Sequence, residues 1–143
     1  MPYTIHIDPD VNCAFIKNYG AFEVGQMSRA AEEVFNHSDY RAGMNILRDT
    51  RDRPYPSDLW FKSLSNAAKS IDKKFAHKSS QCRWAIVVGN VQSYAKIHQA
   101  LVAGRISTAL IERKAFRDIE KALRWLDIPE GYEINYPAPD ETS

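Results

Sequence analysis

The residues best suited to ligand chemistry lie in a polar segment at the end of a predicted strand. The apolar run from Met44 to Leu47 is followed by the polar sequence RDTRDRP, from Arg48 to Pro54. Arginine binds phosphate and carboxylate groups through paired N–H donors, and open α/β sheets usually place ligands at the carboxyl ends of their strands. We therefore expect Arg48, Arg51 and Arg53 to form an anion-binding patch.

Two further residues are expected beside this patch. Ser57 is a good cap for the next helix, whose N-terminal amides and dipole favour an anion, and Asn90 follows a predicted neighbouring strand. Phosphorylation of Ser57 would add about −1.5 to −2 charges beside the arginines. In the alternative interpretation Ser57 is only a cap, and acidic neighbours neutralise the arginines in surface ion pairs. The predicted partner- or ligand-binding set is Arg48, Asp49, Arg51, Arg53, Ser57 and Asn90.

Cys13 is a second candidate for chemistry. It would face His6 across an N-terminal hairpin if the turn paired Ile7 with Asn12, and a neighbouring histidine can activate a thiolate. The alternative is that Cys13 is a small packing residue within a strand. We expect the packing role.

Other catalytic signals are missing from the sequence. His37, His77 and His98 show no metal-ligand spacing with cysteine or acidic residues. The chain also has no G-x-S-x-G, Walker or G-x-G-x-x-G motif. The sequence therefore predicts no catalytic residue, no metal and no cofactor, and indicates a protein that is not an enzyme.

Composition narrows the class of protein further. A chain of 143 residues with 44% hydrophobic residues has the size of one domain. Lysine and arginine total 19 against 18 acidic residues, so the net charge of +1 gives no specific signal for nucleic acid. Two cysteines, no secretory signal and no apolar run long enough to cross a bilayer favour a cytoplasmic protein with no membrane span.

Hydrophobic periodicity predicts an alternation of strands and helices. Strands are expected over Tyr3–Ile7, Val11–Tyr19, Met44–Leu47, Trp84–Val88 and Thr108–Arg113. Four helices are expected, with apolar stripes that run from Met27 to Phe35, from Trp60 to Phe75, from Tyr94 to Val102 and from Ile119 to Leu126. The first two strands should pair antiparallel, and the others need helical crossovers. This order predicts an α/β domain with a five-stranded mixed sheet, and a buried Trp84–Val88 strand.

The chain is expected to divide at residue 130. Residues 1–130 should form the domain, and residues 131–143 an acidic tail without enough apolar content to order itself. No lysine or arginine follows Leu126, whereas five acidic residues do: Asp127, Glu130, Glu133, Asp140 and Glu141. We expect a flexible C-terminal segment.

The element order, and two sequence runs, are similar to those of the SpoIIAA-like superfamily of bacterial STAS and Sec14-like (CRAL-TRIO) domains. The runs are YAKIHQAL, from Tyr94 to Leu101, and AFRDIEKALRWL, from Ala115 to Leu126. The second contains the alanine-x-x-tryptophan-leucine pattern common at the end of such domains. Where antagonists of anti-sigma factors carry a phosphorylated serine in aspartate-serine-serine-glycine-leucine, this chain has Pro56-Ser57-Asp58-Leu59, without the glycine and the preceding aspartate.

The resemblance implies a regulatory or protein-interaction domain, with the segment after the third strand facing a protein partner. Its Sec14 side implies a binder of a small anionic or apolar ligand, or of a lipid, with Met27, Trp60, Phe61, Tyr94 and Trp125 as apolar lining. We expect core packing of these five side chains, with the apolar lining as the alternative. The regulatory or protein-interaction domain is therefore the leading prediction and the ligand or lipid binder the alternative, and a homodimer is compatible with either.

Overall fold

A computed structural model of the chain describes residues 3–20, 23–52, 61–75, 81–103 and 111–137. Its strands are β1 (Tyr3–Asp8), β2 (Cys13–Asn18), β3 (Asn45–Asp49), β4 (Cys82–Val87) and β5 (Ile111–Phe116). Its helices are α1 (Val24–Asn36), α2 (Phe61–Lys74), α3 (Val91–Ala103) and α4 (Ile119–Trp125), with a 3-10 turn at Pro9–Val11. Within the described residues this is the predicted order of elements.

The five strands form one mixed sheet in the order β1-β2-β3-β4-β5. β1 pairs with β2 antiparallel, and all later neighbours pair parallel. Crossovers between parallel strands have a fixed, right-handed sense, so successive steps in one direction put α1, α2 and α3 on the same side of the sheet. The prediction of an α/β fold with a five-stranded mixed sheet and an N-terminal hairpin is confirmed.

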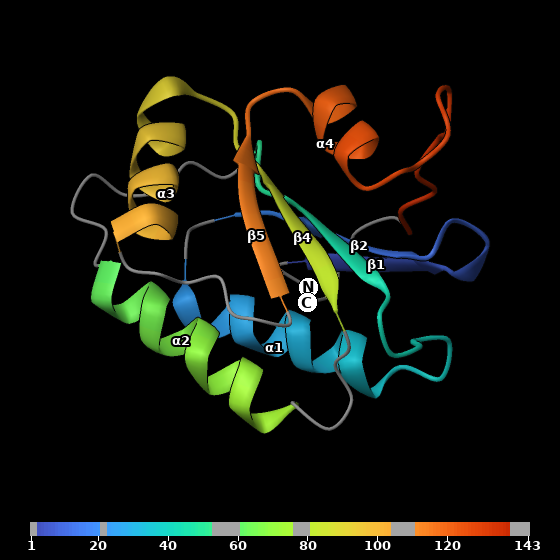
Figure 1. Cartoon of the computed structure of the whole chain (residues 1–143), viewed down its shortest axis with the longest axis horizontal. Helices are drawn as coiled ribbons and strands as arrows, with labels where there is room; N and C mark the ends of the chain where they lie inside the picture. Colours follow the sequence, from blue (N-terminus) through green and yellow to red (C-terminus); the bar gives the residue numbers. More distant parts are fainter. Residues whose placement is uncertain (1–2, 21–22, 53–60, 76–80, 104–110, 138–143) are drawn as a thin grey trace.

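The two sides of the sheet have different covers (Figure 1). Side chains of β1 to β4 pack with α1 and α2 on what we call the helix-layer face, where Ile46 and Trp84 are buried. On the opposite face, which we call the C-terminal face, Phe15 and Leu47 pack with α4 and with the chain that follows it. Each interior strand therefore has one set of side chains in each core.

Burial agrees with the apolar stripes predicted for the second and fourth helices. Ile71, Ala122 and Leu126 within these stripes are all buried, and β4 lies between β3 and β5 as a buried strand. The last strand ends at Phe116, three residues after the expected Arg113, and the expected start at Thr108 lies outside the described residues. Trp60 and the side chain of Leu64 lie outside the described residues.

The hairpin register differs from the one that would activate Cys13. Asp8 accepts a hydrogen bond from the Asp10 amide at 3.0 Å, and Asn12 takes a left-handed conformation with φ of 52°. The connection therefore uses residues 9–12, and Cys13 pairs with Asp8, whereas His6 pairs with Phe15. The predicted Ile7–Asn12 pairing, and with it the Cys13–His6 contact, is wrong. Burial raises the pKa of the Cys13 thiol, which opposes thiolate formation.

The segment after α4 packs against the sheet as far as the structure describes it. The Tyr132 ring stacks on Phe15 with centroids 5.6 Å apart, and its hydroxyl donates to Asp8 at 2.6 Å. Ile134 and Tyr136 pack against the same cluster. Residues 131–137, expected within a flexible tail, thus cover part of the C-terminal face, and residues 138–143 lie outside the described chain.

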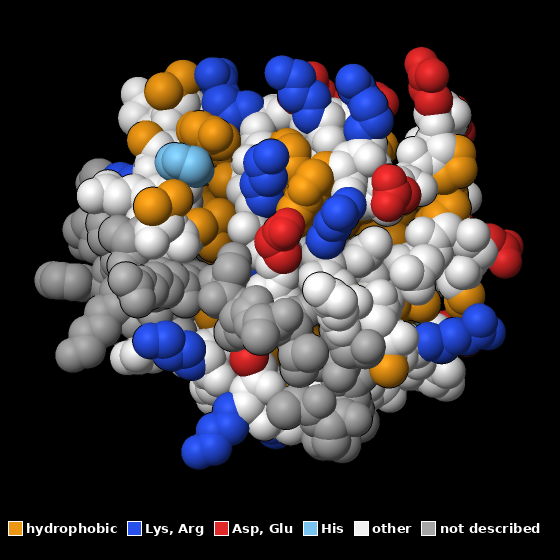
Figure 2. Space-filling model, in the orientation of Figure 1, with side chains coloured by type: hydrophobic (Ala, Val, Ile, Leu, Met, Phe, Trp, Pro, Cys, Tyr) orange, Lys and Arg blue, Asp and Glu red, His pale blue; other side chains and the backbone are white. Residues whose placement is uncertain are grey.

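Two surface properties complete the architecture. Within the described residues, no helix has both the length and the apolar character needed to cross a membrane. Basic and acidic side chains are interspersed over the visible side of β5 and α4 (Figure 2), in keeping with the net charge of +1.

Candidate functional site

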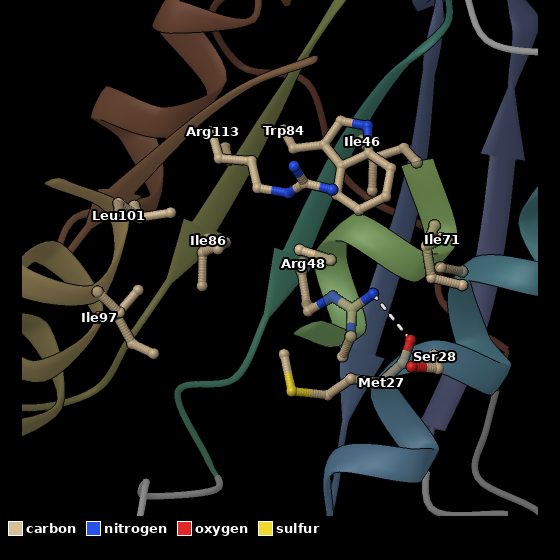
Figure 3. A pocket seen from close by; sticks show the side chains of 15 residues that line it. Met27, Ser28, Ile46, Arg48, Ile71, Trp84, Ile86, Ile97, Leu101 and Arg113 are labelled. Atoms are coloured by element: carbon tan, nitrogen blue, oxygen red, sulfur yellow. Dashed lines mark hydrogen bonds between the residues drawn. The ribbon is translucent and has the colours of Figure 1, made fainter. Parts of the chain in front are cut away.

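A cavity of about 80 Å³ lies between the sheet and the three helices of the helix-layer face. Met27 of α1, Ile71 of α2 and Ile97 of α3 line it, together with strand residues such as Ile46 and Ile86 (Figure 3). One water molecule needs about 10–15 Å³ on the same measure. The cavity therefore has room for a small organic molecule.

Small side chains at the helix–sheet interface create this space. Four helix alanines, Ala31, Ala67, Ala68 and Ala100, line the cavity, whereas the side chain of Ala85 belongs to the cluster of the C-terminal face. Alanine brings a helix close to the sheet without filling the volume that leucine or methionine would fill. Protein interiors are normally close-packed, so a space lined by four helix alanines is an unusual feature of this interface.

Arg48 places a positive charge on the wall of this cavity. Side chains alternate between the two faces of a strand, and Arg48 therefore shares the helix-layer face with Ile46, two residues before it. Its side chain is 5% exposed, and its Nη2 donates a hydrogen bond of 3.1 Å to the carbonyl oxygen of Met27 (Figure 3). The predicted anion-binding residue Arg48 is thus an internal residue, which faces the helices rather than solvent.

A second arginine lines the same cavity but carries a different set of contacts. Arg113 of β5 makes hydrogen bonds of 2.7 and 3.1 Å to the two carboxylate oxygens of Asp72 in α2. Its guanidinium also lies over the Trp84 ring, 4.4 Å from the centroid. This bidentate, stacked arrangement fixes one wall of the cavity and ties α2 to the sheet.

Asp49 and Arg51 form a tight unit at the carboxyl edge of the sheet. Asp49 accepts hydrogen bonds from the backbone amide, Nε and Nη2 of Arg51 at 3.1, 3.0 and 2.9 Å. The pKa of Arg51 is raised, chiefly by this hydrogen bonding. Asp52, in turn, lies 3.5 Å from the Lys17 amine. The structure thus shows the Asp49–Arg51 ion pair that the alternative interpretation of this loop anticipated.

Close backbone contacts hold this edge in place. Thr50 donates to the Val87 carbonyl from its amide at 2.9 Å and from its hydroxyl at 2.8 Å. A Cβ atom on Gly89 would lie 2.4 Å from the Arg51 carbonyl oxygen, so the backbones approach more closely than any other residue would allow. Asn90 accepts a 2.7 Å hydrogen bond from the Ser93 amide, which is the geometry of a helix cap for α3.

The predicted binding set is therefore spread over more than one place. Arg48 lies on the cavity wall, Asp49 and Arg51 pair at the strand end, and Asn90 caps α3. Arg53 and Ser57 lie outside the described residues. Arg113 and Asp72 were missed by the sequence analysis. Strand alternation could have found Arg113, because it shares the buried side of β5 with Ile111 and Ala115, whereas Glu112 and Lys114 are exposed on the other side.

The predicted apolar lining is partly corrected. Met27 lines the cavity, and Tyr94 packs against the neighbouring cluster of α3 and β5 while stacking on His98. Trp125 lies on the C-terminal face, with its ring 5.5 Å from that of Phe116. Trp125 thus has the core-packing role and does not line the cavity, because the chain from β5 into α4 passes to the other side of the sheet. Trp60 and the side chain of Phe61 lie outside the described residues.

Neither a metal centre nor a known relative accounts for the site. Within the described part of the chain, no three histidine, cysteine or acidic side chains gather closely enough to hold a metal ion. No match was found to a family model, to a curated protein or to a solved structure.

Proposed function

We propose that this chain is a noncatalytic domain that binds a small organic molecule in the cavity of the helix-layer face. The observation that carries the proposal is the cavity of about 80 Å³ itself, lined chiefly by apolar side chains from α1, α2, α3 and the sheet. Ligand sites in proteins are typically concave and mostly apolar, with a few polar groups that fix the ligand's orientation. Arg48 and Arg113 would be those polar groups here.

The proposal agrees with the Sec14 side of the SpoIIAA-like resemblance, with one restriction on size. The four helix alanines leave space for a molecule of a few carbon atoms, not for a phospholipid with two acyl chains. We therefore propose a sensor or carrier of a small metabolite, in which ligand binding stabilises the packing of the helices on the sheet.

A matched pair of variants tests this function. Ala100 and Ala122 are both almost fully buried helix residues, but only Ala100 lines the cavity. We expect the wild type to bind 1-hexanol, a neutral probe, in a calorimetric titration. Ala100→Met should fill the cavity and weaken this binding at least about tenfold, which corresponds to about 1.4 kcal/mol.

Ala122→Met, on the other face, is the control that should bind hexanol like the wild type, provided that circular dichroism shows it folded. A wild type that does not bind hexanol would contradict the proposal. Equal hexanol affinity in Ala100→Met and the wild type would also contradict it, because the molecule would then bind elsewhere.

The carboxyl edge of the sheet supports a second candidate, a regulatory contact with a protein partner. Arg51 is 40% exposed in its side chain, whereas the Asp49 that holds it is 1% exposed. A guanidinium held in this way by a buried carboxylate presents an ordered charge at the surface and loses little entropy on binding. Arg51→Ala should weaken capture of such a partner while leaving the hexanol affinity unchanged. Phosphorylation of Ser57 remains a prediction within this second function.

A further inference from the structure

We infer that the outer side of α3 is a homodimer surface, on which a second copy of this chain packs its own α3 in antiparallel orientation. Four exposed residues form this surface, which we call the outer stripe: Val91, Ala95, His98 and Val102. The inference is independent of the proposed function, because none of these four residues lines the cavity.

α3 has apolar side chains on two sides, whereas a surface helix normally has one apolar stripe. Its inner side, with Ile97, Ala100 and Leu101, lines the cavity. Within the described residues, the large hydrophobic side chains that are exposed are Val91 and Val102, at 56% and 66%, and both lie on the outer side of α3. Hydrophobic side chains accordingly appear in Figure 2 where Figure 1 places α3. Exposed apolar side chains that gather on one element typically mark an interaction surface.

The spacing of the outer stripe aligns its members along the helix. Intervals of four, three and four residues separate Val91, Ala95, His98 and Val102. Because an α-helix has 3.6 residues per turn, these intervals return to the same side at each turn, as they do where two helices pack along their length. The stripe extends about 16 Å from Val91 to Val102.

Charge favours a second copy as the occupant. α3 has one lysine or acidic residue, Lys96, among its 13 residues, whereas α2 has five among 14. Lys96 lies about a third of a turn away from the stripe. A two-fold interface places a surface against itself, so an uncharged stripe meets its copy without repulsion between like charges. A lipid surface fits less well, because helices that lie on membranes are rich in lysine and arginine.

The outer stripe is also complementary to itself in size. Rotation about a two-fold axis at its midpoint brings Val91 opposite Val102 of the second copy, because the two valines are equally far from the midpoint. The same rotation brings Ala95 opposite His98 of the second copy. Each imidazole then lies against an alanine that leaves room for it, which is the packing of large into small on which close helix contacts depend. A parallel pair would instead place His98 against His98.

The size of the surface predicts a weak dimer. One helix side provides fewer residues than the roughly 20–30 per partner of a standard interface, so the contact belongs to the transient class. We expect a dissociation constant on the order of 100 µM. Sedimentation equilibrium of the full chain at pH 7, from 10 µM to 1 mM, should therefore show a mass that rises from one chain towards two.

Two single variants and their mixture test the surface and its orientation. Val102→Glu and Val91→Lys should each weaken self-association at least about tenfold, because a charge would lose water against an apolar neighbour. An equimolar mixture of the two variants should associate more tightly than either alone, since the antiparallel pair places the new opposite charges against each other. Lys121→Gln is the control: it changes the net charge by the same amount as Val102→Glu, at an exposed position on α4, and should dimerise like the wild type.

A wild type that stays monomeric at 1 mM would overturn the inference, as would a monomer that floats with phosphatidylcholine vesicles, which would assign the stripe to lipid. Val102→Glu that dimerises like the wild type would also overturn it, by placing the interface elsewhere. A mixture no tighter than the single variants would overturn the antiparallel pairing. Both valines are more than half exposed, so both variants should fold and keep the wild-type affinity for hexanol. If one variant fails to fold, the wild-type series and the other variant still decide.

Discussion

The two faces of the sheet are covered by different kinds of side chain. On the C-terminal face, α4 and the chain after it cover the strands with aromatic and aliphatic side chains, and Phe116, Trp125, Phe15 and Tyr132 form ring contacts. On the helix-layer face, four helix alanines and two arginines line a cavity. Arginine and open space in an interior are both costly to stability, and this contrast supports our proposal that the first face maintains the fold and the second binds a ligand.

Removal of Asp72 should have the largest effect on stability. Its side chain is 12% exposed and that of Arg113 only 3%, and breaking such a buried pair costs about 3–5 kcal/mol because the remaining charge loses its partner oxygens. Asp72→Ala should therefore lower the free energy of unfolding, measured in urea, by about that amount. Asp127→Asn is the control, because the Arg83–Asp127 pair is 3.8 Å apart with Asp127 89% exposed and asparagine tolerates the left-handed φ of 60° at this position, so it should cost about 0–1 kcal/mol. Equal losses in the two variants would contradict the assignment of Arg113 as a fixed wall.

Truncation of a side chain in the core of the C-terminal face should have the second largest effect on stability. Leu126 is 1% exposed and closes the C-terminal core behind α4. Leu126→Ala should cost about 2–5 kcal/mol of unfolding free energy, as typical of a leucine removed from a core that cannot collapse around the gap. Val102→Ala, at a side chain 66% exposed on α3, should change stability by about 0.5 kcal/mol or less. If Leu126→Ala left the free energy of unfolding unchanged, the C-terminal face would not be the tightly packed one.

The same two alanines used for the binding test also compare the packing of the faces. Ala122→Met forces extra atoms into a filled core and should cost about 1–3 kcal/mol. Ala100→Met extends into the cavity and should cost less than about 1 kcal/mol, or stabilise the fold. The measurement is the difference in thermal unfolding between the two variants. A larger loss of thermal stability in Ala100→Met than in Ala122→Met would show that the cavity does not accommodate the added atoms.

Alkaline titration should give the smallest effect, and it concerns both faces. Burial first, and then the Glu33 carboxylate, raise the pKa of Tyr3 to about 12, and burial raises that of Tyr40 to about 12. An unfolded tyrosine ionises near pH 10, so between pH 10 and 12 the unfolded chain releases protons that the folded chain keeps. Stability should be complete below pH 10 and fall through this window.

Tyr3→Phe removes one of these groups and should make the fall in stability between pH 10 and 12 shallower. Tyr132 and Tyr136, on the other face, also have raised pKa values, chiefly through burial, so part of the fall should remain. The measurement is the urea midpoint at pH 9, 10, 11 and 12. An unchanged slope in Tyr3→Phe would show that its hydroxyl is not held neutral by the fold.

Periodicity in the sequence was enough to predict the mixed sheet, the hairpin and the helices, because apolar spacing determines which elements can form. The polar run after the third strand predicted Arg48 as a ligand-binding residue, which stays a prediction, but did not predict its buried location. Arg48 and Asp49 lie on opposite faces because side chains alternate along β3. Which of the two faces the helices could not be predicted, because a strand of five residues between polar loops does not fix its own register. Tyr132 was missed for another reason, since its stacking on Phe15 joins residues far apart in the chain, and its neighbours are polar.

The most direct test of ligand binding in the helix-layer face is a methyl NMR titration of the full chain with 1-hexanol. Selective labelling of isoleucine and methionine distinguishes Met27, Ile86 and Ile97 on the cavity wall from Ile128 on the C-terminal face. Our account predicts saturable shifts of the three cavity methyl groups, with Ile128 unaffected. Shifts concentrated at Ile128, or no saturable shift at the cavity methyl groups, would contradict it.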